Sequence, residues 1–345
     1  MKKNILLLSV ILIVGAMLIS CNQNKKTNPE NESKFSKLTG PYLGQKPPGM
    51  TPEIFVPGLL SAGRGEFKIT FSPDGKEFCY NFSSPAAQWI VEPTGLFKKS
   101  FMMYSHMENG CWTEPEEFSF NPDLEKYYPF FSPDGKRLYF NEIKTGAPRK
   151  LYVERQNGAW REPKEIELTG GFQNKGLFIS IAGNGNLYFG MSPDGENTFI
   201  YMSRNENGLY SIPEKLSNVV NEAGGAHHPY IAPDESYIIF DYPKSKNGSG
   251  EEDLYISFRD QNGKWMEPQN MGQEINTVYR DKRAFVSFDG KYLFFISNRI
   301  NPEIPKGPLT LKQVQRLMSV PANSFQHIYW VDAKIIEELK PDHLK

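Results

Sequence analysis

The sequence predicts an all-β protein: a single closed β-propeller of five four-stranded blades, with six blades as the alternative, whose N-terminal strand closes the last blade. Three observations lead to this prediction. A turn sequence recurs along the chain, an Asn-Gly element recurs between its copies, and the last repeat lacks its final strand. The turn is clearest as FSPDGKEFCY at residues 71–80 and as FSPDGKRLYF at residues 131–140.

The Asn-Gly element sets the period of the repeat. It reads NGCWTEP at residue 109, and its four copies have glycines spaced 48, 50 and 55 residues apart. A period of about fifty residues is typical of propeller repeats. Turns related to Ser-Pro-Asp-Gly alternate with these elements and begin at Ser72, Ser132, Ala182, Ala232 and Ser287. Five turns indicate five blades.

The third turn is the least obvious of the five. We assign it to AGNG at Ala182 rather than to SPDG at Ser192, because the second candidate ends only 13 residues before the next Asn-Gly glycine, Gly208. The equivalent turns of the other repeats lie much further from theirs. The AGNG sequence therefore keeps the period of the repeat.

The residue types explain the order of elements within one repeat. Proline fixes φ at the second turn position, and glycine takes the left-handed conformation at the fourth. Aromatic-rich runs such as YYPFF and RLYFNE flank the turn and are typical of strands. Each repeat therefore contains an inner strand, a tight turn, a second strand, a variable loop, a third strand, an Asn-Gly turn and a fourth strand with Trp-Glu-Pro, which together form one blade.

The fifth repeat predicts how the ring closes. Its third strand is expected within residues 325–336, FQHIYWVDAKII, and no fourth strand follows. The segment TPEIFVPGLL at residues 51–60 stands before the first turn at the spacing of a fourth strand. We therefore expect this segment to complete the last blade.

The N-terminus predicts export and a lipid anchor. Two lysines and a mostly apolar run precede Cys21, and the ending LISC resembles a bacterial lipobox. An ordinary signal peptide or a short anchor helix is the alternative. We expect a signal peptide at residues 1–20, a lipidated flexible tether at residues 21–48 and the propeller at residues 49–345. Asn22 after the cysteine favours the outer membrane, with a periplasmic or a surface-exposed location left open.

Charge and cysteine content narrow the range of partners. The formal net charge is −1 and no basic stripe is present, so we expect no nucleic-acid partner. The membrane is expected to be contacted through the lipid anchor alone. Cys79 and Cys111 could form a disulfide in an oxidising compartment or remain buried thiols.

The turn motifs resemble those of the TolB-like, WD40-like propeller family in which Pro-Asp replaces the usual signature. The resemblance covers roughly residues 51–336 and rests on FSPDGKEFCY, FSPDGKRLYF, YIAPDESYIIF and FVSFDGKYLFF. The third repeat lacks Pro and Asp, and the fourth lacks Gly. The resemblance implies a binding or scaffold module of the bacterial envelope, although some relatives are polysaccharide lyases or peptidases, and it implies six blades more often than five.

Loop lengths separate the two faces of the predicted disc. The tight turns lie on one face, and the long, variable loops between second and third strands open on the other. The last long loop contains one expected helix, with Thr310 as its cap and Leu311, Val314, Leu317 and Met318 on one side. We expect this helix to form a lid over the rim or to pack on a neighbouring blade.

The long-loop face also receives the inner strands as they enter the channel, so we place a ligand site there. Pairs of residues five and four positions before each turn stand at this entry, and strand alternation lets one member of each pair face the channel. The candidate ligand-binding residues are Arg64, Lys68, Glu125, Tyr127, Tyr128, His227, His228, Arg280, Asp281, Arg283 and His327.

The predicted function is non-catalytic binding of an envelope protein, a peptide or a glycan. The alternative is a glycan-active enzyme, a lyase or a glycosidase, with its site at the channel mouth, where Glu66, Glu125 and Asp281 could supply a carboxylate pair. His227, His228 and His327 could together bind a metal, but no ligand motif supports such a site, and we predict neither metal nor cofactor. No catalytic residues are assigned.

Overall fold

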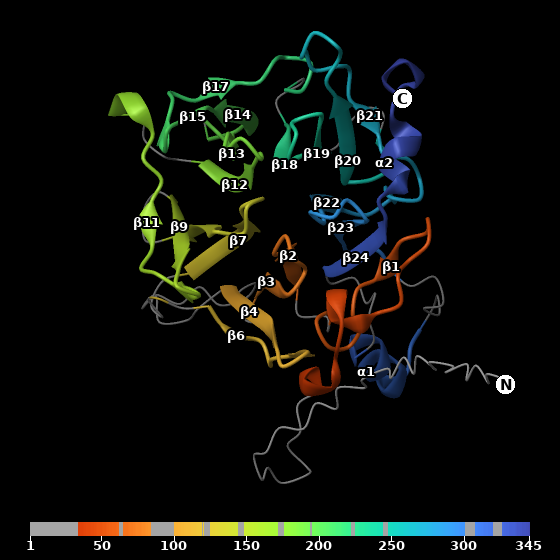
Figure 1. Ribbon diagram of the computed structural model, residues 1–345. Helices are drawn as coiled ribbons and strands as arrows, with labels where there is room; N and C mark the ends of the chain where they lie inside the picture. Colours follow the sequence, from red (N-terminus) through yellow and green to blue (C-terminus); the bar gives the residue numbers. More distant parts are fainter. Residues whose placement is uncertain are drawn as a thin grey trace, which may run out of the picture.

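Strand pairing forms five blades in the computed structural model, one for each repeat of the sequence (Figure 1). The structure describes residues 34–61, 65–83, 100–118, 120, 125–143, 148–171, 176–193, 195–221, 225–243, 248–300, 308–319 and 326–345. Cys21 and Arg64 lie outside these residues.

Each blade contains four antiparallel strands that follow one another from the central axis outward. The first has β2 (Glu66–Phe71), β3 (Glu77–Ser83), β4 (Ser100–Glu108) and β6 (Glu116–Glu117). The second has β7 (Glu125–Phe131), β8 (Arg137–Ile143), β9 (Arg149–Gln156) and β11 (Lys164–Glu165). The third has β12 (Gly176–Ile181), β13 (Leu187–Met191), β14 (Phe199–Ser203) and β17 (Glu214–Lys215).

The last two blades follow the same order. The fourth has β18 (His227–Ile231), β19 (Tyr237–Pro243), β20 (Glu252–Phe258) and β21 (Gln269–Asn270). The fifth has β22 (Asp281–Val286), β23 (Tyr292–Ser297), β24 (His327–Asp332) and β1 (Glu53–Ile54). Three Asn-Gly hairpins involve the short strands β5 (Cys111–Trp112), β10 (Ala159–Trp160), β15 (Asn205–Glu206) and β16 (Leu209–Tyr210). The predicted count of five blades is confirmed.

The predicted closure by the N-terminal strand is confirmed as well. β1 pairs with β24, with Ile54 opposite Tyr329. The pairing continues through Phe55, whose amide donates to the carbonyl of Ile328 at 2.8 Å. One correction concerns β24, which ends at Asp332 because the chain then turns into the helix α2 (Lys334–Leu339) with Ile336 buried.

The five tight turns have the predicted chemistry, including AGNG in the third blade. The fourth turn residue has positive φ in every blade, and in blade four this residue is Glu235, with φ of 59°. A non-glycine residue is strained in this conformation. The carboxylate of Glu235 accepts hydrogen bonds from Asn184, Asn186 and Tyr188 of the third blade at 2.6–3.0 Å. These inter-blade bonds offset the strain and account for the missing glycine.

Packing of the chain on the tight-turn face begins before residue 49, the expected start of the propeller. The short 3-10 helices η2 (Phe35–Lys37) and η3 (Pro41–Gly44) contribute three buried side chains to the core, Phe35, Tyr42 and Leu43. The Tyr42 hydroxyl donates to Asp289 in the last tight turn at 2.9 Å. Residues 34–48 are therefore part of the packed domain, in contrast to the flexible tether expected for them.

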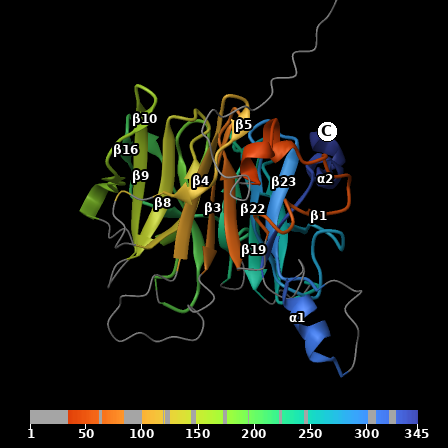
Figure 2. The same ribbon diagram turned by 90° about the horizontal axis from the view of Figure 1, so that it is seen from below.

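The expected helix in the last long loop is α1 (Leu311–Ser319), and Thr310 caps it by accepting a hydrogen bond from the Gln313 amide. It lies on the face opposite the Asn-Gly hairpins, toward the edge of the disc (Figure 2). Leu311 is 72% exposed and Val314 is 37% exposed, so neither packs closely on a neighbouring blade. The side chains of Leu317 and Met318 are outside the described part. No helix in the described ranges has both the length and the apolar character required to cross a bilayer.

The structure excludes a disulfide between Cys79 and Cys111. Cys79 is a free, fully buried thiol in the second strand of the first blade. It therefore does not pair with Cys111, and burial raises the pKa of its thiol well above the ordinary value.

Candidate ligand site at the channel mouth

The inner strands share a backbone irregularity close to the end where they enter the channel. Each of the five pairs with its second strand through a register shift. In blades two to five, the residue four positions before the tight turn has a positive φ between 46° and 66°. A bulge of this kind re-aims a side chain that regular alternation would place elsewhere. The four residues are Tyr128, Phe178, His228 and Arg283.

These four side chains meet Lys68 of the first blade around a small cavity on the axis. The five residues, one from each blade, are called the mouth cluster below: Lys68, Tyr128, Phe178, His228 and Arg283. Each is the second member of its predicted pair. The free space between them is about 10 Å³, roughly the volume that holds one water molecule.

An aromatic layer closes the channel beneath the mouth cluster. Phe130, Tyr230 and Phe285 come from three different inner strands, and their ring centroids lie 5.9–6.4 Å apart. All three are buried. The channel is therefore blind at this depth, and a ligand of the mouth cluster has to approach from the long-loop face.

Polar side chains of the second strands hold three of the strained residues in place. In each case a side-chain oxygen accepts a hydrogen bond from the backbone amide of a left-handed residue in the next blade. This bond satisfies a buried amide that the strand ladder leaves unpaired. The pairs are Asn81 with Tyr128 at 2.8 Å, Asn141 with Phe178 at 3.2 Å, and Asp241 with Arg283 at 3.2 Å.

Asp241 differs from its two counterparts because it is charged, and it organises a chain of polar groups. Both of its carboxylate oxygens lie 2.9 Å from Nδ1 of His228. Arg283 donates from Nε to Nε2 of the same imidazole at 3.1 Å. Because Nε2 accepts a proton donor, the neutral ring carries its hydrogen on Nδ1 and donates it to Asp241.

Burial and neighbouring charges shift the pKa values of His228 and Asp241. Burial lowers the pKa of His228 to about 3, helped by Arg283 and opposed by Asp241. Burial alone would raise the pKa of Asp241, but the hydrogen bond from His228 and the charge of Lys282 hold it below its usual value. At neutral pH the site therefore contains a neutral imidazole between a carboxylate and a guanidinium.

Lys68 is the second cation of the mouth cluster. It is 6% exposed, and its Nζ donates to the carbonyl of Ala284 at 3.1 Å. Burial, together with the nearby charge of Arg283, lowers its pKa to about 7, while Asp241 acts in the opposite direction. The amine therefore changes charge close to neutral pH.

Six of the predicted residues do not line the cavity, and Arg64 lies outside the described part of the chain. The six are Glu125, Tyr127, His227, Arg280, Asp281 and His327. Tyr127 is half-buried, and its hydroxyl donates to the carboxylate of Glu125. Arg280 donates to Glu251 at 2.7 Å, and both side chains are about half exposed. These contacts place Tyr127, Glu125 and Arg280 around the site rather than in it.

Asp281 and His327 were predicted to face the channel, but the structure buries both within blades. Asp281 accepts hydrogen bonds from Arg299 at 2.8 Å and from the amide and hydroxyl of Thr277. His327 is fully buried, with Nδ1 3.6 Å from a carboxylate oxygen of Glu66. Asp281 precedes the bulge of its inner strand, where regular alternation directs it away from the axis. His327 begins β24, the third strand of its blade, and pairs there with Ser297.

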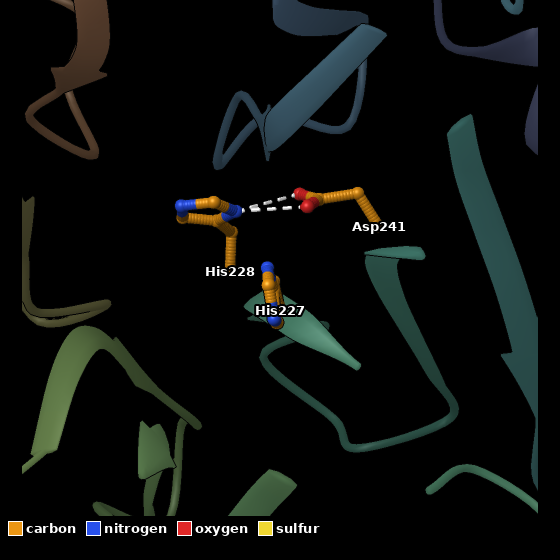
Figure 3. A group of neighbouring side chains, drawn as sticks. All are labelled: His227, His228 and Asp241. Atoms are coloured by element: carbon orange, nitrogen blue, oxygen red, sulfur yellow. Dashed lines mark hydrogen bonds and ion pairs between the residues drawn. The ribbon is translucent and has the colours of Figure 1, made fainter. Parts of the chain in front are cut away.

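His227, His228 and Asp241 have potential ligand atoms within 4.8 Å of one another (Figure 3). A metal-bound histidine normally donates its second ring N–H to an acceptor. Here Nε2 of His228 faces the donor Nε of Arg283, which is the opposite arrangement. His327, the third histidine considered, is engaged beside Glu66. The hydrogen bonding around His228 therefore disfavours a metal at this position.

Two residues of the site were missed by sequence reasoning. Phe178 stands in one of the predicted entry pairs but is not among the candidate residues, and Asp241 is not among them either. The sequence does carry a signal for Asp241, because it stands where the first and second repeats have Asn81 and Asn141. A charged residue in one blade, at a position where other blades have an amide, indicates a role specific to that blade.

Comparisons with known proteins return similar solved structures but no sequence relatives. No protein-family model and no curated protein sequence matches the chain. Among solved structures, a TolB from Agrobacterium tumefaciens is similar at 14% identity over 77% of this chain and 90% of that one, with a TM-score of 0.45. An arabinanase from Bacillus subtilis has 11% identity over 78% and 96%, with a TM-score of 0.44.

A third similar structure is a protein of unknown function from Dyadobacter fermentans, at 10% identity over 72% of this chain and 79% of that one, with a TM-score of 0.45. The neighbours thus include both TolB and glycan-active propellers. Likenesses of this strength say nothing about function, and the propeller assignment rests on the strand pairing.

Proposed function

We propose that this protein is a non-catalytic binding module of the bacterial cell envelope, held there by a lipid on Cys21, and that it binds a protein, peptide or glycan at the channel mouth. The observation that carries the proposal is the mouth cluster. Each blade contributes one side chain to a blind cavity, and four of the five do so through a strained backbone. Strain at four equivalent positions supports a role in recognition.

The chemistry of the cluster suits binding better than catalysis. His228 is the obvious base, but its Nε2 is occupied by Arg283 and its pKa is lowered to about 3. A general base works best with a pKa near the operating pH. Of the carboxylates considered for acid and base work, Asp281 is bonded to Arg299 and Glu66 is buried beside His327.

A glycan-active enzyme is the second candidate, and the His228–Asp241 pair at the mouth is the observation that favours it. A substrate that drew Arg283 away from the imidazole would free Nε2 to accept a proton. Incubation with pectic, host and algal glycans tests this reading. Cleavage products that disappear in His228→Ala would establish it and remove the non-catalytic proposal.

A binding screen tests the first candidate. The mature chain with Cys21→Ala is incubated with solubilised envelope proteins and with arrayed peptides and glycans. Arg283→Ala should reduce binding of the retained ligand at least tenfold, because an arginine anchor at the centre of a binding site often carries more than about 1.4 kcal/mol. Arg280→Ala, a neighbouring rim arginine, is the matched control and should bind as the wild type does. Equal loss in both variants, or in neither, would contradict a site at the mouth cluster.

A further inference from the structure

The mouth cluster brings two cations, Lys68 and Arg283, together in one cavity. Lys68 and Arg283 come from the first and the fifth blade, and Lys68 bonds to the carbonyl of the residue after Arg283. None of the described residues that line the cavity carries a carboxylate. Asp241 lies behind His228, and its oxygens are used by that ring and by the Arg283 amide. The opening therefore presents positive charge to an approaching ligand.

Both cations have N–H donors beyond those used in hydrogen bonds to other described residues. Arg283 uses Nε toward His228 and Nη1 toward Phe67 and Gln326, and no bond from its Nη2 to another described residue is found. Lys68 has three N–H donors and gives one to Ala284. A carboxylate offers two oxygens that could satisfy the remaining donors of both groups.

We propose that the mouth cluster recognises the carboxylate of an acidic peptide, held between Nζ of Lys68 and Nη2 of Arg283. This inference rests on the proposed binding function and names the ligand group. An anion at this point would relieve the repulsion between the two cations. It would also give Lys68 a partner for its charge, which burial otherwise disfavours.

The geometry favours a peptide carboxylate over the uronate of a glycan. The free space of about 10 Å³ holds one water-sized atom, so a carboxylate can place one oxygen in the cavity while its other atoms stay in the opening. The narrow arm of an aspartate or glutamate side chain allows this approach. The aromatic faces that could stack on a sugar are already covered. Phe178 lies against His228 at 3.9 Å between ring centroids, and Arg283 lies over Tyr128 at 5.5 Å.

Isothermal titration of the mature Cys21→Ala chain tests the proposal. The probes are the blocked tripeptides acetyl-Gly-Glu-Gly-amide and acetyl-Gly-Gln-Gly-amide, with digalacturonate as the glycan acid. At pH 6.5 the Glu peptide should bind at least tenfold more tightly than the Gln peptide and than digalacturonate. Equal binding of the two peptides, no binding of the Glu peptide up to 10 mM, or a preference for digalacturonate would each overturn the proposal.

Two lysine variants separate a direct role from general destabilisation. Lys68→Met should reduce affinity for the Glu peptide at least tenfold. Lys150→Met is the matched control, because Lys150 is also fully buried with its pKa lowered to about 7, yet it lies over Phe189 outside the cavity. It should leave the affinity unchanged once melting confirms that both variants fold. Equal loss in the two variants would refute the role of Lys68.

The pH dependence of binding tests the role of Lys68 independently of the variants' affinities at one pH. The free Lys68 amine deprotonates near pH 7, so affinity for the Glu peptide should fall about tenfold between pH 6 and pH 8 and become flat in Lys68→Met. A wild-type affinity that is flat over this interval would contradict the proposal. The groups that face Lys68 from the neighbouring strands are Arg283 of β22, Asp241 of β19, His228 of β18 and Tyr128 of β7.

The two proposals fail in different ways. If the screen retains a ligand that Arg283→Ala releases, but the Glu and Gln peptides bind alike, the binding function stands and the acidic ligand is wrong. If neither the screen nor the peptides show binding that depends on Arg283, both proposals are removed.

Discussion

Replacing Phe55 by alanine should weaken the propeller at its closure. Phe55 is fully buried immediately after β1, and its ring centroid lies 5.9 Å from Phe71 of the first blade. On the other side it lies 5.2 Å from Phe294 and 5.0 Å from Trp330 of the fifth blade. Truncating a buried phenylalanine costs about 3–5 kcal/mol through lost transfer free energy and the cavity left behind. At this position the loss falls on the seam between the first and last blades.

Thermal unfolding and hydrogen exchange together measure this effect. For a domain of roughly 300 residues, a loss of about 4 kcal/mol lowers Tm by about 6 °C. Phe131→Ala, in the inner strand of the second blade, removes an equally buried ring and serves as the control. Exchange should accelerate in β24 and β2 for Phe55→Ala, and in β7 and β8 for the control. An unchanged melting temperature, or the same exchange pattern in both variants, would refute closure by the N-terminal segment.

Three further predictions concern the inter-blade bonds, the buried lysine and the anchor. Asn81→Ala should cost about 1–3 kcal/mol in urea unfolding, because it leaves the partly buried amide of Tyr128 without its acceptor. Lys68→Met should stabilise the protein at pH 6 by up to about 5 kcal/mol, since the pKa of Lys68 falls from 10.5 to about 7 on folding. The difference in free energy of unfolding between Lys68→Met and the wild type should shrink as pH rises from 7 toward 10, because the unfolded wild type then loses the proton that folded Lys68 has already lost. A difference that stays constant over this pH range in urea unfolding would contradict the prediction. Cys21→Ala should abolish lipid labelling and release the protein from membranes, and labelling that persists would exclude Cys21 as the anchor.

The propeller was predictable because its signals are local and repeated. The tight turn needs a left-handed residue at its fourth position, and glycine supplies it in four of the five copies. Spacing alone identified AGNG as the third turn, and the structure places it between β12 and β13. The missing final strand likewise predicted the pairing of β1 with β24.

The site was harder to predict because it depends on a departure from local rules. Period-two alternation does not say which member of an adjacent pair faces the axis once a bulge intervenes. Tyr128, Phe178, His228 and Arg283 have no glycine-like signature, so their left-handed backbone is set by tertiary contacts. Asp281 and His327 were expected at the channel because their side chains carry functional groups. Their positions on their strands instead direct both side chains into the interior of a blade.

The face on which the N-terminal segment packs determines which face of a lipid-anchored propeller would point toward the membrane. Residues Pro41–Gly44 pack beside the tight turn that contains Asp289, whereas the mouth cluster opens toward the opposite face, on which α1 also lies (Figure 2). Twelve residues lie between Cys21 and Lys34, a chain that spans at most about 45 Å when fully extended. A lipid on Cys21 would therefore hold the tight-turn face toward the bilayer and leave the mouth cluster facing away from it. This orientation suits a ligand that arrives from the aqueous compartment. Quenching by spin-labelled lipid should accordingly be stronger for a fluorophore at Asp74 than for one at Gln326, and the reverse order would contradict the orientation.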